Sequence, residues 1–174
     1  RQGATQIILS DKEISFKKLP IPMLLCVGAI NAFLIGKKLR GYVSINVQSG
    51  EALDTHSFAT LIGVGATTIN PYLAFDSLYQ RHGKKLFGQY SFDDCIQRYI
   101  KSVNAGLLKI MSKMGISVLS SYRGGCNFET VGLSRTIVDD YFPGVVSKIS
   151  GIGLIGIEKK IRQIHKEAFE STDT

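Results

Sequence analysis

The sequence predicts an α/β fold, in the form of a partial or truncated β/α-barrel-like parallel sheet with flanking helices. Short apolar runs alternate along the chain with longer segments of helical periodicity. This alternation is typical of parallel βαβ units with right-handed crossovers. The pattern contains four predicted strands, which are too few for a closed eight-stranded barrel, so half a barrel or an open sheet is expected.

The first third of the chain contains two predicted strands and one apolar helix. Residues Gln6–Ser10 form a short apolar run that ends at Asp11. Residues 22–39 predict a helix that is apolar on most sides and therefore buried on most sides. Residues 42–47 are rich in β-branched side chains and precede the polar segment 48–51, so they predict the second strand.

The middle of the chain is predicted to continue the alternation. A short helix over 55–64 is expected to stop at Gly65, because glycine accepts the left-handed conformation that ends many helices. A third strand over 67–69 leads to Asn70, and a helix over 73–81 follows it.

The longest predicted helix begins after Ser91, with Asp94 three residues later in the capping-box position. Its apolar side chains repeat at spacings of three and four, which predicts one buried face. Gly115 is the expected end of this helix, and 116–119 is predicted as the fourth strand. The residues of the predicted buried face are Ile96, Tyr99, Ile100, Val103, Leu107, Ile110, Met111 and Met114.

The last third of the chain is predicted to be mainly helical. Helices are expected over 127–131, Arg135–Tyr141 and 156–169, and the last of these is amphipathic. Residues 171–174 are expected to be a frayed end. The chain opens at Arg1 without an initiator methionine and enters a strand pattern almost at once, which indicates a fragment whose N-terminal part is missing.

Polar side chains follow each predicted strand, and the carboxyl ends of parallel strands meet at one edge of a sheet. They are therefore expected to form a polar rim that faces a ligand, a channel or a neighbouring domain. The alternative is a set of ordinary loops whose polar groups meet water. Arg123 is the most informative member, since a guanidinium can clamp a carboxylate or dock a domain. The rim residues are Asp11, Ser49, Gly50, Glu51, Asn70, Ser120, Ser121, Tyr122 and Arg123.

Two local patterns suggest chemistry but lack the context that it needs. Residues 151–156 match GxGxxG, yet the preceding apolar run is short and no second strand with an acidic residue follows, so a turn into the last helix is expected. His56 lies near Glu51 and Asp54, but no nucleophile completes a set, and Asp54 or Thr55 is expected to cap a helix. No catalytic, cofactor-binding or metal-binding residue is therefore predicted.

Composition indicates an ordinary globular chain. Its 174 residues carry a net charge of +7, but the basic residues are scattered, which disfavours a nucleic-acid surface. Prolines and a glycine interrupt the apolar stretch 19–35, which favours a buried helix over a membrane span. Cys26, Cys95 and Cys126 are far apart and lack metal-site spacing, so free thiols in a reducing compartment are expected.

Several segments of the chain are distinctive when they are taken together, and the longest is GLLKIMSKMGISVLSSYRG at 106–124. With PIPMLL at 20–25 and DTHSFATLIGVGA at 54–66, it resembles the glutamate synthase family, in the central region of its large chain. NPYLA and SKISG add shorter matches. The chain departs from the family pattern at Ser57, Val64 and 125–127.

The resemblance implies that 1–170 is an incomplete central domain, similar in fold to a truncated β/α barrel. In the family this domain lies between an amidotransferase domain and an FMN-binding barrel, and the enzyme makes two glutamates from glutamine and 2-oxoglutarate. Ammonia travels inside the protein between the two sites. The implied role is scaffold and passage wall, with Glu51, Asn70, Ser120, Ser121, Tyr122 and Arg123 as the expected surface. FMN and a 3Fe-4S cluster are implied for the full-length enzyme and none for this region.

Residues 103–109 and 119–122 resemble the ferredoxin-dependent branch of the family, which implies ferredoxin as electron donor. Lysine outnumbers arginine, as suits an AT-rich plastid genome, so a plastid stroma is expected, with a bacterial cytoplasm as the alternative. Two other functions remain open at this point. One is a stand-alone α/β enzyme that binds a phosphate or carboxylate at the polar rim. The other is a basic nucleic-acid module.

Overall fold

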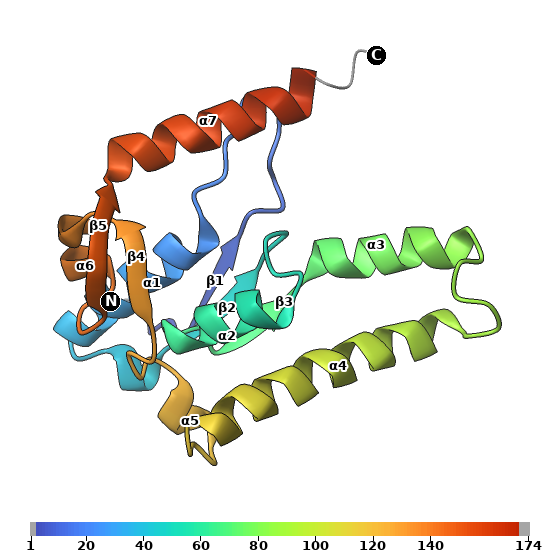
Figure 1. The fold of residues 1–174 in the computed structure, drawn as a ribbon, viewed down its shortest axis with the longest axis horizontal. Helices are drawn as coiled ribbons and strands as arrows, with labels where there is room; N and C mark the ends of the chain where they lie inside the picture. Colours follow the sequence, from blue (N-terminus) through green and yellow to red (C-terminus); the bar gives the residue numbers. More distant parts are fainter. Residues whose placement is uncertain (1–2, 171–174) are drawn as a thin grey trace.

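Two separate parallel sheets and seven α-helices make up residues 3–170, the part of the chain that the computed structural model describes (Figure 1). The first sheet has the order β1-β2-β3, and β4 pairs with β5 in the second. The strands are β1 Gln6–Ser10, β2 Ser44–Gln48, β3 Thr68–Asn70, β4 Glu129–Leu133 and β5 Val146–Ile152. The helices are α1 Met23–Gly36, α2 Thr55–Gly63, α3 Tyr72–Gly83, α4 Phe92–Lys113, α5 Leu119–Tyr122, α6 Arg135–Tyr141 and α7 Leu154–Glu170, with a 3-10 turn at Arg40–Tyr42.

The first sheet packs only one of its faces against helices. Its buried side chains alternate along the strands, with Ile45 and Val47 of β2 at the centre. They contact Val27 of α1, Phe58 of α2 and Val103 of α4 in one apolar core. Because β1, β2 and β3 are parallel and sequential, right-handed crossovers place the connecting helices α1 and α2 on the same side.

The second sheet is joined to the first through α6 and α1. The core under α6 consists of Ile137, Val138 and Phe142, and Leu24 of α1 packs against it. Gly28 of α1 allows this approach, since a Cβ at that position would lie 2.7 Å from the Tyr141 carbonyl oxygen. The described residues thus form a mixed α/β fold with short parallel sheets and no closed barrel, which confirms the predicted partial-barrel class.

Two predicted elements of the second half are wrong. Residues 116–119 form no strand, and 127–131 belong largely to β4 rather than to a helix. Gly115 adopts a φ of 70°, and the Ile116 N–H donates to the Met111 carbonyl at 2.9 Å, so the chain turns back at the end of α4. Short apolar runs do not distinguish strand, turn and helix by periodicity alone, and here tertiary packing decided both cases.

The helical hairpin of α3 and α4 projects away from the first sheet (Figure 1). The capping box at the start of α4 is confirmed: Ser91 accepts from the Asp94 N–H, and the Asp94 carboxylate accepts from the Ser91 N–H. Val103 and Met111 are buried as predicted, but Ile100 and Met114 stay 37% and 41% exposed. Part of the predicted buried face therefore has no cover among residues 3–170.

Three further expectations concern cysteines, membranes and the end of the chain. Cys26, Cys95 and Cys126 are free thiols. Among residues 3–170, no helix has both the length and the apolar character that crossing a membrane requires. The predicted frayed end, 171–174, lies outside the described residues.

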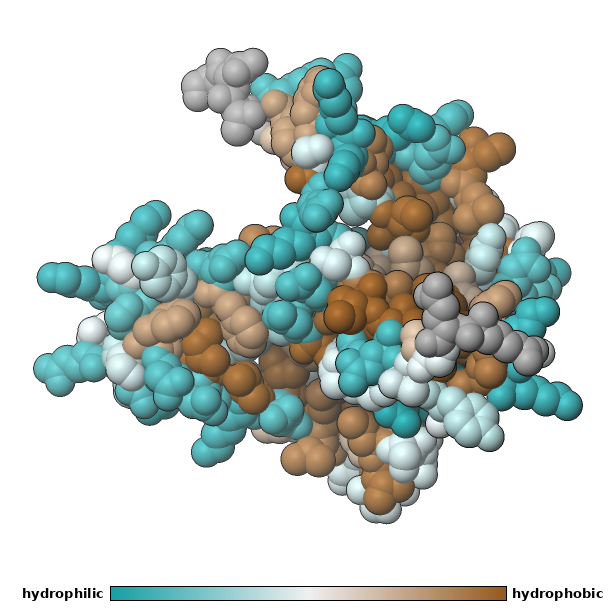
Figure 2. Space-filling view, turned by 180° about the vertical axis from the view of Figure 1, so that it is seen from behind, coloured by the Kyte–Doolittle hydropathy of each residue, from teal (hydrophilic) through white to brown (hydrophobic). Residues whose placement is uncertain are grey.

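Large apolar side chains are exposed on several elements. Ile8, Phe33, Val131, Ile149 and Ile155 are each more than 60% exposed. Figure 2 shows apolar side chains gathered near the middle of one face of the molecule, with hydrophilic side chains around them. Contiguous apolar surface of this kind marks an interaction site or promotes self-association.

We expect the isolated 174-residue chain to oligomerise or aggregate, because this apolar surface has no cover among the described residues. Light scattering over a concentration series measures this directly. Adding mild detergent is the control, since it should reverse association that apolar surface drives. A monomer that unfolds cooperatively at all concentrations would contradict the expectation.

Candidate functional site

The second face of the first sheet is open and largely polar. It consists of alternate residues of the three strands, which we call the open sheet face: Gln6, Ile8, Ser10, Ser44, Asn46, Gln48, Thr68 and Asn70. Neighbouring strands are linked across it, because Ser10 Oγ donates to Gln48 Oε1 at 2.8 Å and Thr68 Oγ1 donates to Asn46 Oδ1 at 2.7 Å. Ile8 is 70% exposed in its middle. Parallel sheets are normally covered on both faces, so this face, left open among residues 3–170, is a candidate interaction surface.

A buried hydrogen-bond network closes the carboxyl edge of the same sheet. Asp11, directly after β1, accepts from Ser49 Oγ at 2.6 Å and from the Gly50 N–H at 3.0 Å. Ser49 Oγ in turn accepts from the Glu51 N–H at 3.1 Å. Burial and a hydrogen bond to Asp11 raise the pKa of Tyr72 to about 12. These contacts tie the strand ends to the start of α3 and satisfy a carboxylate that is removed from water.

Glu51 connects this edge to the start of α1. Its Oε2 accepts from the Met23 N–H at 3.0 Å, which satisfies one of the unpaired donors of the first helical turn. Burial raises the pKa of Glu51, although its hydrogen bond from Met23 acts in the opposite direction. Burial, together with the nearby Glu51 and Asp11 charges, also raises the pKa of Cys26, so this thiol is a weak nucleophile.

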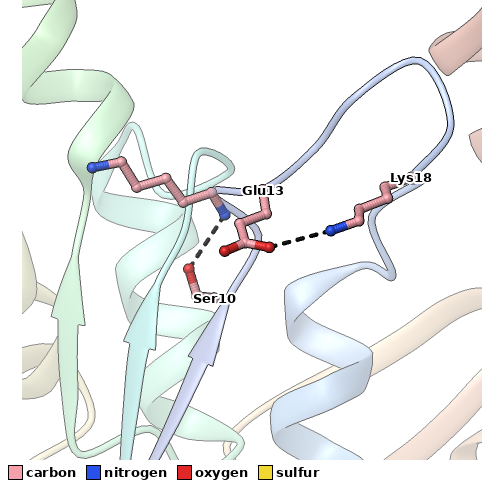
Figure 3. A network of polar contacts seen from close by, with 4 residues as sticks. Ser10, Glu13 and Lys18 are labelled. Carbon is pink, nitrogen blue, oxygen red and sulfur yellow. Dashed lines mark hydrogen bonds and ion pairs between the residues drawn. The ribbon is translucent and has the colours of Figure 1, made fainter.

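The loop after β1 borders a pocket of about 370 Å³ beside the start of α1. Ser10 Oγ accepts from the Lys12 N–H at 3.3 Å. Figure 3 shows Ser10, Glu13 and Lys18, which line the pocket, and Lys18 Nζ lies 3.3 Å from Glu13 Oε2. Both charged side chains are mostly exposed, so this ion pair contributes little to stability. The pocket is otherwise lined mainly by apolar side chains, including Ile14 and Met23.

The structure divides the predicted rim between opposite edges of the sheet. Asp11, Ser49, Gly50, Glu51 and Asn70 meet at the carboxyl ends of the strands, as predicted. Ser120 to Arg123 do not join them, because no strand precedes these four residues. Arg123 instead lines a pocket with Gln6, Ser44 and Thr67, which lie where the strands begin.

The four residues of this second group differ in their surroundings. Tyr122 is 1% exposed, and its hydroxyl donates to the Ala59 carbonyl at 3.2 Å, so it belongs to the core rather than to a surface. Ser120 and Ser121 are exposed on the single turn of α5. Arg123 follows this turn and is half-buried.

Sequence reasoning missed most of the open sheet face. The predicted rim consisted of residues that follow the strands, whereas Ser44, Asn46 and Thr68 belong to β2 and β3 themselves. The signal was the alternation Ser-Ile-Asn-Val-Gln of β2, since a strand buried on both sides of a parallel sheet is usually apolar throughout.

The two chemical patterns have structural explanations. Gly151 lies inside β5, where a Cβ would come within 2.7 Å of the Gly132 Cα, so the first glycine of GxGxxG allows close contact with β4. Asp54 caps α2 by accepting from the Ser57 N–H at 2.8 Å, while His56 is exposed. Within residues 3–170, no three His, Cys, Asp or Glu side chains are grouped as a metal site requires.

Comparison with known proteins shows the family. A family model described as the glutamate synthase central domain matches residues 1–134. The chain belongs to the glutamate synthase central domain family. This family assignment covers the first sheet, the open sheet face and both groups of predicted rim residues.

Similarity to individual glutamate synthases extends over nearly the whole chain. It is 52% identical over 169 residues to the glutamate synthase [NADPH] large chain of Azospirillum brasilense and 46% identical to that of Bacillus subtilis. It is 43% identical over 185 residues to the ferredoxin-dependent glutamate synthase of Pyropia yezoensis. These matches cover 97%, 97% and 99% of the chain, but it spans only about 11 to 12% of the length of these relatives.

Proposed function

We propose that this chain is the central-domain part of a glutamate synthase, which transfers the amide nitrogen of glutamine reductively to 2-oxoglutarate and yields two L-glutamate. Its own role is that of an interdomain scaffold and a wall of the ammonia passage, without a catalytic centre. The observation that carries this proposal is the family match over residues 1–134 in a chain that spans about 11% of its relatives. This match favours the scaffold role over the alternative of a stand-alone enzyme that binds its substrate at the polar rim.

The open sheet face supports the proposed scaffold role. A parallel sheet that leaves one face bare requires a neighbour on that face. Its polar groups are neutral amides and hydroxyls, which can exchange hydrogen bonds with ammonia without protonating it. Asn70, at the end of β3, is the predicted passage residue that belongs to this face, whereas Glu51 binds the start of α1.

The partners in this proposal are the amidotransferase and FMN domains of the same full-length chain. FMN and a 3Fe-4S cluster belong to those other parts. The residues of this chain do not fit an FMN phosphate at the GxGxxG motif, because the Gly132 backbone already occupies the space beside Gly151. We propose no nucleic-acid or membrane partner.

Ferredoxin stays the predicted electron donor of the whole enzyme, and NAD(P)H is the alternative. The ferredoxin-dependent chain of Spinacia oleracea is 40% identical and aligns over 187 positions, which is 13 more than the 174 residues of this chain. The two bacterial NADPH chains align over 169 positions at higher identity. The shorter alignments to the bacterial chains need fewer gaps, so this comparison favours a pyridine nucleotide over ferredoxin as the donor. A plastid stroma is the proposed location with ferredoxin, and a bacterial cytoplasm with NADPH.

A bulky residue on the open sheet face tests the passage. In the full-length enzyme, Asn70→Trp is expected to lower the glutamate formed per glutamine hydrolysed, because the indole narrows the space beside β3. Glutamine hydrolysis and synthesis from added ammonium should be retained. Lys101→Trp, on the exposed side of α4, is the control.

Unchanged coupling in Asn70→Trp would contradict a passage at this face, and loss of both half-reactions would show that the residue supports domain docking instead. The same assays, run with reduced ferredoxin and with NADPH, identify the donor. Activity with NADPH alone would overturn the ferredoxin prediction.

A further inference from the structure

A polar pocket of about 300 Å³ lies at the amino edge of the first sheet, opposite the Asp11 network. It borders the starts of all three strands, through Gln6, Ser44 and Thr67. Two guanidinium groups, from Arg40 and Arg123, line it, and no acidic side chain among residues 3–170 does. The pocket is continuous with the open sheet face, because Gln6 and Ser44 belong to both.

Arg40 is held rigidly by three hydrogen bonds to neutral partners. Nε donates to Asn31 Oδ1 at 2.6 Å, Nη1 to the Val43 carbonyl at 2.5 Å and Nη2 to the Gly65 carbonyl at 2.6 Å. These bonds fix the guanidinium plane but leave its charge unbalanced. Burial, and to a lesser degree the Arg123 charge, lowers the pKa of Arg40.

Arg123 supplies the second positive charge, and this charge is unpaired within residues 3–170. Its backbone N–H donates to the Leu119 carbonyl at 2.9 Å, but its guanidinium forms no hydrogen bond or ion pair with any of residues 3–170, where all four ion pairs involve other side chains. Thr67 adds a hydroxyl donor, because its Oγ1 already accepts from the Ile45 N–H at 3.1 Å and its own proton is left over. Two like charges that line one pocket are stabilised when an anion binds there.

We propose that Arg40 and Arg123 form a carboxylate-binding site at the amino edge of the sheet. A planar carboxylate matches the forked donors of a guanidinium, and a rigid Arg40 lowers the entropy lost on binding. The carboxylate comes either from an Asp or Glu side chain of another domain or from a small free acid. Binding of a side chain from another domain rests on the proposed scaffold role, whereas binding of a free acid does not.

The test uses the full-length enzyme with three variants: Arg123→Gln, Arg123→Lys and the control Lys109→Gln, which removes one positive charge from an exposed part of α4. Limited proteolysis and the thermal unfolding midpoint are measured with and without glutarate as a free dicarboxylate. Arg123→Gln removes a charge-assisted hydrogen bond that would hold two domains together, so the open state becomes more populated. Protease cleavage at the domain junctions should therefore be about tenfold faster. Arg123→Lys should give an intermediate rate.

The two sources give different outcomes. If a domain carboxylate occupies the site, cleavage accelerates in Arg123→Gln and glutarate changes nothing. If a free acid occupies it, glutarate raises the unfolding midpoint of the wild type but not of Arg123→Gln. If Arg123→Gln matches Lys109→Gln in every measurement, the site is overturned, whereas the ammonia-coupling assay of Asn70→Trp decides the scaffold role independently.

Discussion

Gly151→Ala is expected to destabilise the chain by about 3 kcal/mol, because the added methyl group overpacks a backbone contact that cannot rotate away. A Cβ at this position would lie 2.7 Å from the Gly132 Cα and closer still to its carbonyl carbon and oxygen. Gly132 has a φ of 85°, and the pairing of β4 with β5 is irregular on either side of Val131. The two strands must separate to accept the methyl group, which breaks the second sheet. Urea unfolding followed by circular dichroism at low protein concentration measures the loss.

The same motif contains its own control. Gly153→Ala is expected to be nearly neutral, since among residues 3–170, apart from its two neighbours in the chain, the nearest atom to its Cβ is Ser134 Oγ at 4.0 Å. A phosphate-binding loop would need both glycines, whereas a close strand contact needs only the first. Equal losses in the two variants, or none in Gly151→Ala, would show that the Gly151–Gly132 contact does not limit stability.

Asp11→Ala is expected to cost about 3 kcal/mol, because it leaves buried hydrogen-bond donors without an acceptor. Those donors are the Ser49 hydroxyl and the Gly50 N–H. The Tyr72 hydroxyl also loses its partner, so the pKa of Tyr72 should fall from about 12 toward its ordinary value. The unfolding free energy and the alkaline absorbance titration of tyrosine report these two effects separately.

Two matched variants separate the network from general disturbance of β1. Asp11→Asn keeps one acceptor oxygen, that of the amide, and should lower the free energy of unfolding less than Asp11→Ala does. Ser10→Ala removes two exposed hydrogen bonds, one to Gln48 and one from the Lys12 N–H, and should change stability by less than about 1 kcal/mol. A loss in Ser10→Ala as large as that in Asp11→Ala would contradict a special role for the buried carboxylate.

The two edges of the first sheet have different physical roles. At the carboxyl edge, Asp11 and Glu51 accept hydrogen bonds from internal donors, so these carboxylates hold the strand ends and the start of α1 together. At the amino edge, Arg40 and Arg123 keep their charge available. A scaffold needs both properties, because rigid strand ends hold the open sheet face in place while unpaired charge selects a neighbour.

Local patterns in the sequence determined most of the first half of the fold. The strand β1, the Asp54 cap of α2 and the capping box of α4 were all predictable, because each depends on residues within a few positions of one another. The family was predictable as well, from the match at 106–124 and its companions.

Only the tertiary structure decided which of these segments meet. The turn at Gly115 carries 116–123 away from the carboxyl edge, so Tyr122 enters the core and Arg123 joins Arg40. Residues 127–131 were expected to form a helix, but most of them pair with β5 as part of β4. One side of β2 is not covered, so Asn46 and Gln48 lie on a surface. These outcomes depend on packing between residues far apart in the chain, for which local periodicity carries no information.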